Sequence, residues 1–110
     1  MKQCEIWYAD LNPVKGSEQK GFRPVVIISG NLLNTYLPIV IACPITTKVK
    51  AYKGNVVLEP DHFNGLTEKS EILTFHIRSI SKERLAKKIG KIAEADLLQI
   101  KQTLNDILKY

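Results

Sequence analysis

The apolar residues of this chain change their spacing once, and this change limits what the chain can fold into. Residues 23–28 and 38–43 read RPVVII and PIVIAC, two short unbroken runs that predict buried strands. Each run carries its proline at or next to its start, where a strand tolerates one. From Glu94 onward the apolar residues instead recur along one face of a helix: Leu97, Ile100, Leu104, Ile107 and Leu108. We therefore expect strands followed by one terminal helix.

More short strands are predicted along the chain, at residues 3–9, 54–59, 71–75, 76–80 and 87–92. Turns rich in glycine, asparagine and serine separate many of these segments. Six or seven short strands and a terminal helix predict a small, strongly bent antiparallel sheet or barrel, with the helix covering one side. The strand pattern alone leaves the topology open.

The length and composition suit one globular domain that spans residues 1–110, because 45% of the residues are hydrophobic. No apolar run approaches the roughly 20 residues that cross a bilayer. The first residues lead directly into strand-like sequence, without the apolar region of a signal peptide. We expect a cytoplasmic protein with no membrane partner.

The residues that could bind a soft metal are Cys4, Cys43, His62 and His76, and their spacings match no zinc pattern. We expect no metal and no other cofactor. Two cysteines also make no disulfide framework, and each stands in an apolar segment, where a free thiol behaves as a small hydrophobe.

The chain is basic, with a net charge of +5 and a sequence pI of about 9.3. Its positive residues are concentrated rather than even: the segment 82–91 holds five lysines and arginines and only one acid, Glu83. Such a charge is compatible with a nucleic-acid partner and equally with a plain basic domain.

Several common catalytic motifs are absent from the sequence, including the phosphate-binding loop, the dinucleotide glycine motif, the nucleophile elbow and a glycosidase carboxylate pair. What remains is two polar loops that adjoin buried strands. The loop at 11–22 ends at Arg23, and the lysine-bearing loop at 46–53 begins at Thr46. The ordinary interpretation is a salt bridge from Arg23 to Glu18 or Glu5, and a turn-capping role for Thr46.

The motifs around these two residues resemble the MazF/PemK (Kid) family of toxin endoribonucleases from type II toxin–antitoxin systems. The matching segments are EIWYADLNPVKGSEQKGFRPVVIISGN, VIACPITTKVK, HIRSISKERLAKKIGKI and the terminal helix. They cover nearly the whole chain in the family's order, and the combination of DLNP, GSEQ-x-G-x-RP and PIT is specific. The resemblance implies an SH3-like barrel of about six or seven antiparallel strands with a C-terminal helix, acting as a homodimer.

The same resemblance implies an activity: metal-independent cleavage of single-stranded RNA at a short sequence motif. It makes Arg23 the catalytic arginine and Thr46 the catalytic threonine. It also implies a cognate antitoxin with an acidic, disordered segment. The residues that we expect to contact RNA are Ser17, Glu18, Gln19, Lys20, Phe22, Thr47, Lys48 and His76.

The chain departs from the family pattern at two places. Phe75-His76 replaces the acidic residue and glutamine that precede the Ile-Arg pair in many members, which bears on substrate preference rather than on chemistry. Cys4 stands where the family has a glycine, an exchange expected to be neutral.

The chemistry expected of Arg23 and Thr46 follows from the substrate. RNA carries its own nucleophile, the 2′-hydroxyl, so cleavage needs groups that align the reacting oxygens and stabilise charge on the phosphorane. The guanidinium fork of Arg23 suits that charge, and Thr46 can donate a hydrogen bond to the same phosphate. The alternative is a non-catalytic SH3-like binding module, or a gyrase inhibitor like the CcdB toxins on the same fold; a pure binder has no need of this pair.

Overall fold

The structure is a computed structural model that describes residues 1–11 and 21–110. Strands and helices follow one another in these ranges: β1 (Glu5–Asp10), β2 (Phe22–Ile27), α1 (Asn31–Tyr36), β3 (Ile39–Thr46), β4 (Val57–Leu58), β5 (Ser70–Ile72), β6 (Arg78–Ser81), β7 (Leu85–Lys91) and α2 (Glu94–Lys109). Two 3₁₀ turns flank β6, η1 (Thr74–His76) and η2 (Lys82–Arg84). The expected order, strands first and one long helix last, is confirmed.

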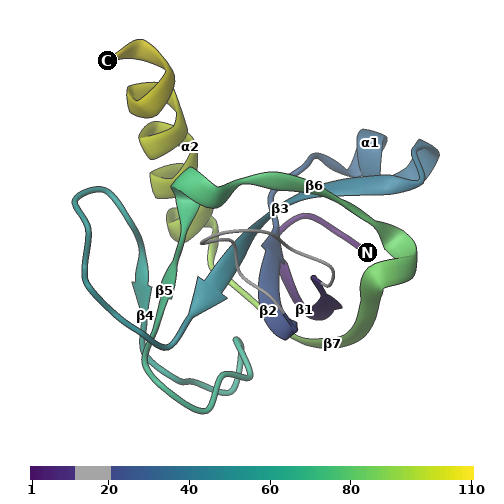
Figure 1. Cartoon of the computed structure of the whole chain (residues 1–110), viewed down its shortest axis with the longest axis horizontal. Helices are drawn as coiled ribbons and strands as arrows, with labels where there is room; N and C mark the ends of the chain where they lie inside the picture. The colour runs from purple at the N-terminus through teal and green to yellow at the C-terminus, as the bar shows by residue number, and fades with distance from the viewer. Residues whose placement is uncertain (12–20) are drawn as a thin grey trace.

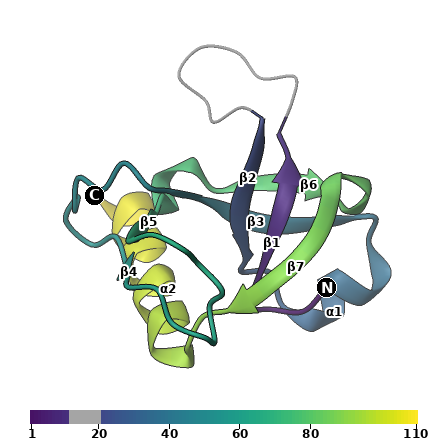
Figure 2. The ribbon, with the colours of Figure 1, turned by 90° about the horizontal axis from the view of Figure 1, so that it is seen from below.

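The strands form one antiparallel sheet in the order β4-β5-β3-β2-β1-β7, and β6 also pairs with β3. The sheet curls strongly, so that β1, β2 and β7 run across β3 and β6 (Figure 2). Helices α1 and α2 lie at opposite sides of this half-barrel (Figures 1 and 2). The predicted bent antiparallel sheet with a C-terminal helix is confirmed.

Two hydrophobic clusters lie on the two faces of the sheet. Val26 belongs to the cluster that α2 covers with Leu97 and Ile100, whereas its neighbours Val25 and Ile27 belong to the other cluster. Successive residues of a strand point to opposite faces, so both faces of β2 are buried. This explains why RPVVII is apolar without alternation.

Some predicted elements are wrong in their extent. The expected strand at 54–59 is reduced to Val57–Leu58, and the one at 71–75 ends at Ile72, after which residues 74–76 form η1. In the opposite direction, the strand predicted at 38–43 continues as β3 to Thr46. Cys4 has a φ of +77°, a conformation that glycine adopts without strain, so its exchange for the family's glycine is not conformationally neutral. No helix in the described ranges is long and apolar enough to span a membrane.

Thr74 is fully buried, and within the described part of the chain its Oγ1 has no hydrogen-bond partner. An unpaired buried hydroxyl destabilises the fold, so we expect Thr74→Val to raise the free energy of unfolding by about 1 kcal/mol in urea titrations. Thr103 is the matched control, because its buried hydroxyl donates to the Gly54 carbonyl. Thr103→Val should lower the free energy of unfolding by a similar amount. A loss of stability in Thr74→Val would show that the hydroxyl is paired.

The Glu5 carboxylate, at the start of β1, is largely buried and accepts hydrogen bonds from the Lys2 N–H (2.9 Å) and the Trp7 indole (3.0 Å), with the Lys88 ammonium at 3.1 Å. Burial alone would raise its pKa, but these three donors together lower the pKa to about 2. Because the folded protein lowers this pKa, ionised Glu5 stabilises the fold at pH values above 4.5, the pKa of the group in the unfolded chain. This stabilisation is lost as the pH falls toward 2.

We therefore expect the free energy of unfolding of the wild type to fall by roughly 2–3 kcal/mol between pH 5 and pH 2 because of this group. Glu5→Gln should be less stable at pH 7 and should lack this part of the pH dependence. Parallel urea titrations of both proteins across this pH range measure the difference. Identical slopes in the two proteins would contradict the role given to Glu5.

Candidate functional site

Arg23 and Thr46 lie at the same end of the paired strands β2 and β3. Val25 is opposite Pro44 in the last pair recorded between these strands. Arg23 stands two residues beyond that pair on β2, and Thr46 stands two residues beyond it on β3. Because side chains alternate along a strand, both residues share the face of Val25 and Pro44. The two predicted catalytic residues therefore flank the point where β2 and β3 diverge.

The hydroxyl of Thr46 is buried and oriented. Only 5% of the residue is exposed, and its Oγ1 accepts a hydrogen bond from the Lys48 N–H at 3.1 Å. This bond is the turn-capping role that the ordinary interpretation predicts. A hydroxyl that accepts one hydrogen bond still has its own proton to donate, so the turn also fixes Thr46 as a donor.

Arg23 is half-buried and lies opposite Ala9 of β1. That position is four residues, or about 13 Å, along β1 from Glu5. The Glu5 carboxylate is occupied by Lys2, Trp7 and Lys88. The predicted alternative of an Arg23–Glu5 salt bridge is therefore wrong.

The structure places some of the predicted RNA-contacting residues around this pair. Phe22 is the first residue of β2 and is 64% exposed, while Thr47 and Lys48 follow Thr46 and are also exposed. His76 lies in η1, which begins directly after Leu73. The Leu73 N–H donates to the Pro44 carbonyl of β3 at 2.8 Å, so η1 starts beside the edge of β3 that faces away from β2 and Arg23. The predictions for Ser17, Glu18, Gln19 and Lys20 fall outside the described residues.

The sequence interpretation assigned no role to Glu71, which lies opposite Thr46 in the β3–β5 pairing. Its side chain is fully buried, and its carboxylate accepts four hydrogen bonds from the 50–55 segment. The sequence does contain an indication of this role. Glu71 is a charged residue at the start of the short apolar run EILTF, in the same way that Arg23 is at the start of RPVVII. Glu71 thus joins the strand beside Thr46 to the loop that follows Thr46.

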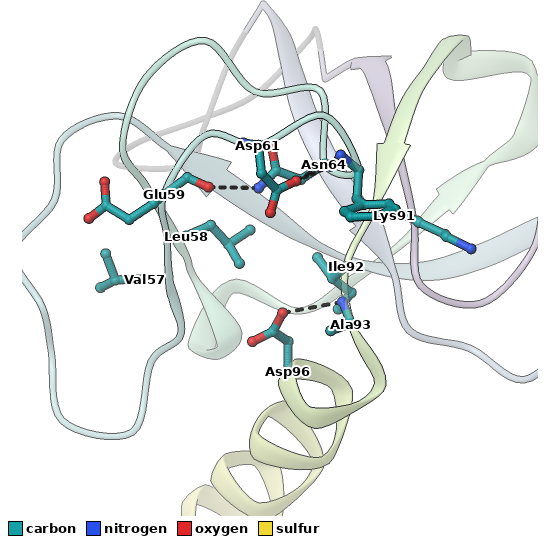
Figure 3. A pocket seen from close by; sticks show the side chains of 10 residues that line it. Val57, Leu58, Glu59, Asp61, Asn64, Lys91, Ile92, Ala93 and Asp96 are labelled. Carbon is teal, nitrogen blue, oxygen red and sulfur yellow. Dashed lines mark hydrogen bonds between the residues drawn. The ribbon is translucent and has the colours of Figure 1, made fainter.

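A separate pocket lies between the β4–β5 connection, the end of β7 and the start of α2 (Figure 3). Glu59, Asp61, Asp96 and Lys91 are among its lining residues. Asp96 in the first turn of α2 accepts a hydrogen bond from the Ala93 N–H at 3.2 Å, which completes the helix start rather than leaving a free carboxylate. Among the described residues, none of the predicted site residues lines this pocket. Across residues 1–11 and 21–110, no three His, Cys, Asp or Glu side chains are grouped to hold a metal ion.

Comparison with known proteins places the chain in a family. Residues 2–108 match the model for the "PemK-like, MazF-like toxin of type II toxin-antitoxin system". The Endoribonuclease MazF of Staphylococcus epidermidis is 36% identical over 107 residues, 96% of this chain and 88% of that protein. The protein of the same name from Staphylococcus saprophyticus is 35% identical over the same shares.

Solved structures agree with these relatives. MazF from Deinococcus radiodurans superposes with a TM-score of 0.85 at 26% identity, covering 100% of this chain and 97% of that one. A MazE–MazF structure from the same organism gives a TM-score of 0.79 at 27% identity, covering 98% and 95%. With the family match over residues 2–108 and the strand ends that carry Arg23 and Thr46, the chain belongs to the PemK/MazF family of type II toxins.

Proposed function

We propose that this protein is an endoribonuclease toxin that cleaves single-stranded RNA at a short sequence motif without a metal ion. The observation that carries the proposal is the placement of Arg23 and Thr46 on one face, where β2 and β3 diverge. The two staphylococcal relatives are named endoribonucleases, which supports the same activity here.

Each of the two residues suits one part of the reaction. The 2′-hydroxyl of the RNA attacks the adjacent phosphorus while the 5′-oxygen leaves, which yields a 2′,3′-cyclic phosphate and a 5′-hydroxyl. The Arg23 guanidinium stays protonated and stabilises the negative charge of the phosphorane through hydrogen bonds. Water accepts the proton that the 2′-hydroxyl loses and supplies one to the leaving 5′-oxygen. Thr46 donates a hydrogen bond from its hydroxyl to a phosphate oxygen, and the Lys48 N–H, which donates to the Thr46 oxygen, orients that hydroxyl. Both residues sit at strand ends, which hold them better than a loop would.

The partner implied by this function is an antitoxin whose acidic, disordered segment covers the basic surface and folds as it binds. The net charge of +5 is compatible with such a segment. A MazE–MazF complex is among the solved structures that share this fold, which supports an antitoxin partner. We further propose that the toxin acts as a homodimer in the cytoplasm.

Removal of either catalytic group should slow cleavage strongly while the protein still folds. We expect Arg23→Ala and Thr46→Val each to lower kcat/KM on single-stranded RNA by about 10²–10³-fold or more, because a preorganised donor to the developing charge is lost. Arg23→Lys should also be poor, since lysine cannot make the bidentate contact. Measured RNA affinity should fall less than the cleavage rate.

Lys87→Ala is the charge-matched control, because Lys87 is exposed on β7 and its loss removes the same unit charge. It should cleave almost as fast as the wild type, whereas full activity in Arg23→Ala would refute the assignment.

The nucleophile makes a second prediction. Replacing the 2′-hydroxyl at the scissile position by hydrogen should abolish cleavage, and excess EDTA should leave cleavage of the unmodified RNA intact. Analysis of the product ends by mass spectrometry should give the cyclic phosphate and the 5′-hydroxyl. Products with 5′-phosphate ends would require another mechanism, and failure to cut a diverse RNA pool would favour a non-catalytic binding module.

A further inference from the structure

The buried carboxylate of Glu71 occupies an anion-binding nest made by the protein itself. Its Oε1 accepts hydrogen bonds from the N–H groups of Lys50 (2.8 Å) and Ala51 (2.7 Å), and its Oε2 accepts from Tyr52 N–H (3.0 Å) and Asn55 Nδ2 (2.8 Å). Successive backbone N–H groups that converge on one anion form such a nest. One side chain on β5 therefore fixes the path of a loop about twenty residues earlier in the chain.

The backbone of this loop is strained where the carboxylate holds it. Ala51 has a φ of +52°, the left-handed region that costs a residue with a side chain about 1–2 kcal/mol. The Ala51 N–H makes a 2.7 Å bond to Glu71, which offsets that cost. Without the carboxylate, we expect the loop to leave this conformation.

Glu71 stays ionised although no part of it is exposed. Burial alone would raise its pKa, but the hydrogen bonds from Asn55, Lys50, Ala51 and Tyr52 hold the pKa below its ordinary value. Near neutral pH the group is therefore a pure acceptor, as the nest requires.

The nest sets the position of an aromatic ring. Tyr52, whose N–H is held by Glu71, packs edge-on against Phe75 with ring centroids 5.6 Å apart, and Phe75 lies 4.8 Å from His76. Tyr52 and Phe75 are about half exposed, at 50% and 49%. Exposed rings of this kind stack on the bases of single-stranded nucleic acid.

The surroundings of the rings favour RNA as the molecule that they contact. The loop that carries Tyr52 also carries the exposed lysines Lys48, Lys50 and Lys53, which suit the phosphates of a single strand. The loop starts at Thr46, whose partner across the β3–β5 ladder is Glu71. The Tyr52 ring is therefore joined to the candidate catalytic residue Thr46 through one short segment.

We propose that Glu71 is a positioning residue for RNA recognition, whose carboxylate holds the 50–55 backbone so that the Tyr52 ring, beside Phe75, stacks on one base of the RNA. This inference rests on the proposed ribonuclease function. Glu71 acts through the loop and does not touch the RNA, whereas Tyr52 contacts the base.

The test compares wild type, Glu71→Gln and Tyr52→Leu on a randomised single-stranded RNA pool, with the cut ends sequenced and kcat and KM measured on the preferred substrate. The side-chain amide of a glutamine has one NH₂ group, which cannot accept the hydrogen bonds that the second carboxylate oxygen accepts. We therefore expect Glu71→Gln to lose part of the nest and to release the loop. Both variants should relax the preference at the same single position of the motif and raise KM about tenfold, with kcat changed little, because one stacked base is lost.

Two matched controls separate positioning from general stability. Glu5→Gln removes another largely buried, hydrogen-bonded carboxylate, and Phe63→Leu removes another exposed ring that lies on a histidine, 4.4 Å from His62. Phe63 belongs to the connection at the far end of the β4–β5 ladder from Tyr52. Both controls should keep the cleavage motif of the wild type, even where Glu5→Gln is less stable.

A rescue tests the mechanism of the nest. Ala51→Gly in the Glu71→Gln background should restore part of the base preference, because glycine adopts a φ near +52° without strain. The same motif and KM in wild type, Glu71→Gln and Tyr52→Leu would overturn the inference. If Glu71→Gln fails to fold, the result for Tyr52→Leu alone decides the test. An unchanged cleavage motif in Tyr52→Leu, together with weaker binding of the antitoxin, would overturn the inference and show that the rings contact the antitoxin. A wild type that cuts no RNA would instead refute the proposed function itself.

Discussion

The rest of the structure depends on the way β3 is shared between two sets of partners. One edge of β3 pairs with β2, while the other pairs first with β6 at residues 39–42 and then with β5 at residues 45–46. Pro44 lies between these two sets of pairs and is tolerated there. The Pro44 carbonyl accepts a hydrogen bond from the Leu73 N–H, so it points to the edge of β3 that faces β5 and β6. In an antiparallel strand the N–H and C=O of one residue point to the same edge. The N–H that proline lacks would therefore point to a position where β3 has no ladder partner. The proline that would break a central strand therefore lies where the ladder on this edge of β3 is already interrupted.

The sequence predicted the parts of the fold whose signal is local. RPVVII and the helical face after Glu94 are short-range patterns, and each is buried as the spacing requires. The structure extends β3 beyond the predicted end at Cys43, although a proline such as Pro44 is not expected in the interior of a strand. Which edge of the strand that proline faces depends on pairing partners, and these are set by residues distant in the chain.

The candidate site divides in the same way. Arg23 and Thr46 could be named from motifs, and strand alternation then explains why they share a face. The nest of Glu71 could not be derived, because its donors lie 16 to 21 residues away and its geometry requires an alanine in a left-handed conformation. The positive φ of Cys4 is not predicted for a related reason: glycine and asparagine are the usual local signals of a left-handed conformation, and a cysteine gives none.

The two halves of the site are held by different kinds of interaction, and this has a consequence for how the protein can vary. Arg23 and Thr46 stand at the ends of strands that the sheet fixes through many hydrogen bonds and two hydrophobic clusters. The loop that carries Tyr52 is anchored to the sheet by four hydrogen bonds to one carboxylate, with a strained residue at its centre. A substitution in the loop therefore changes the surface offered to the RNA bases at little cost to the sheet. On the proposed function, base preference can diverge within this fold while the placement of the catalytic pair stays the same.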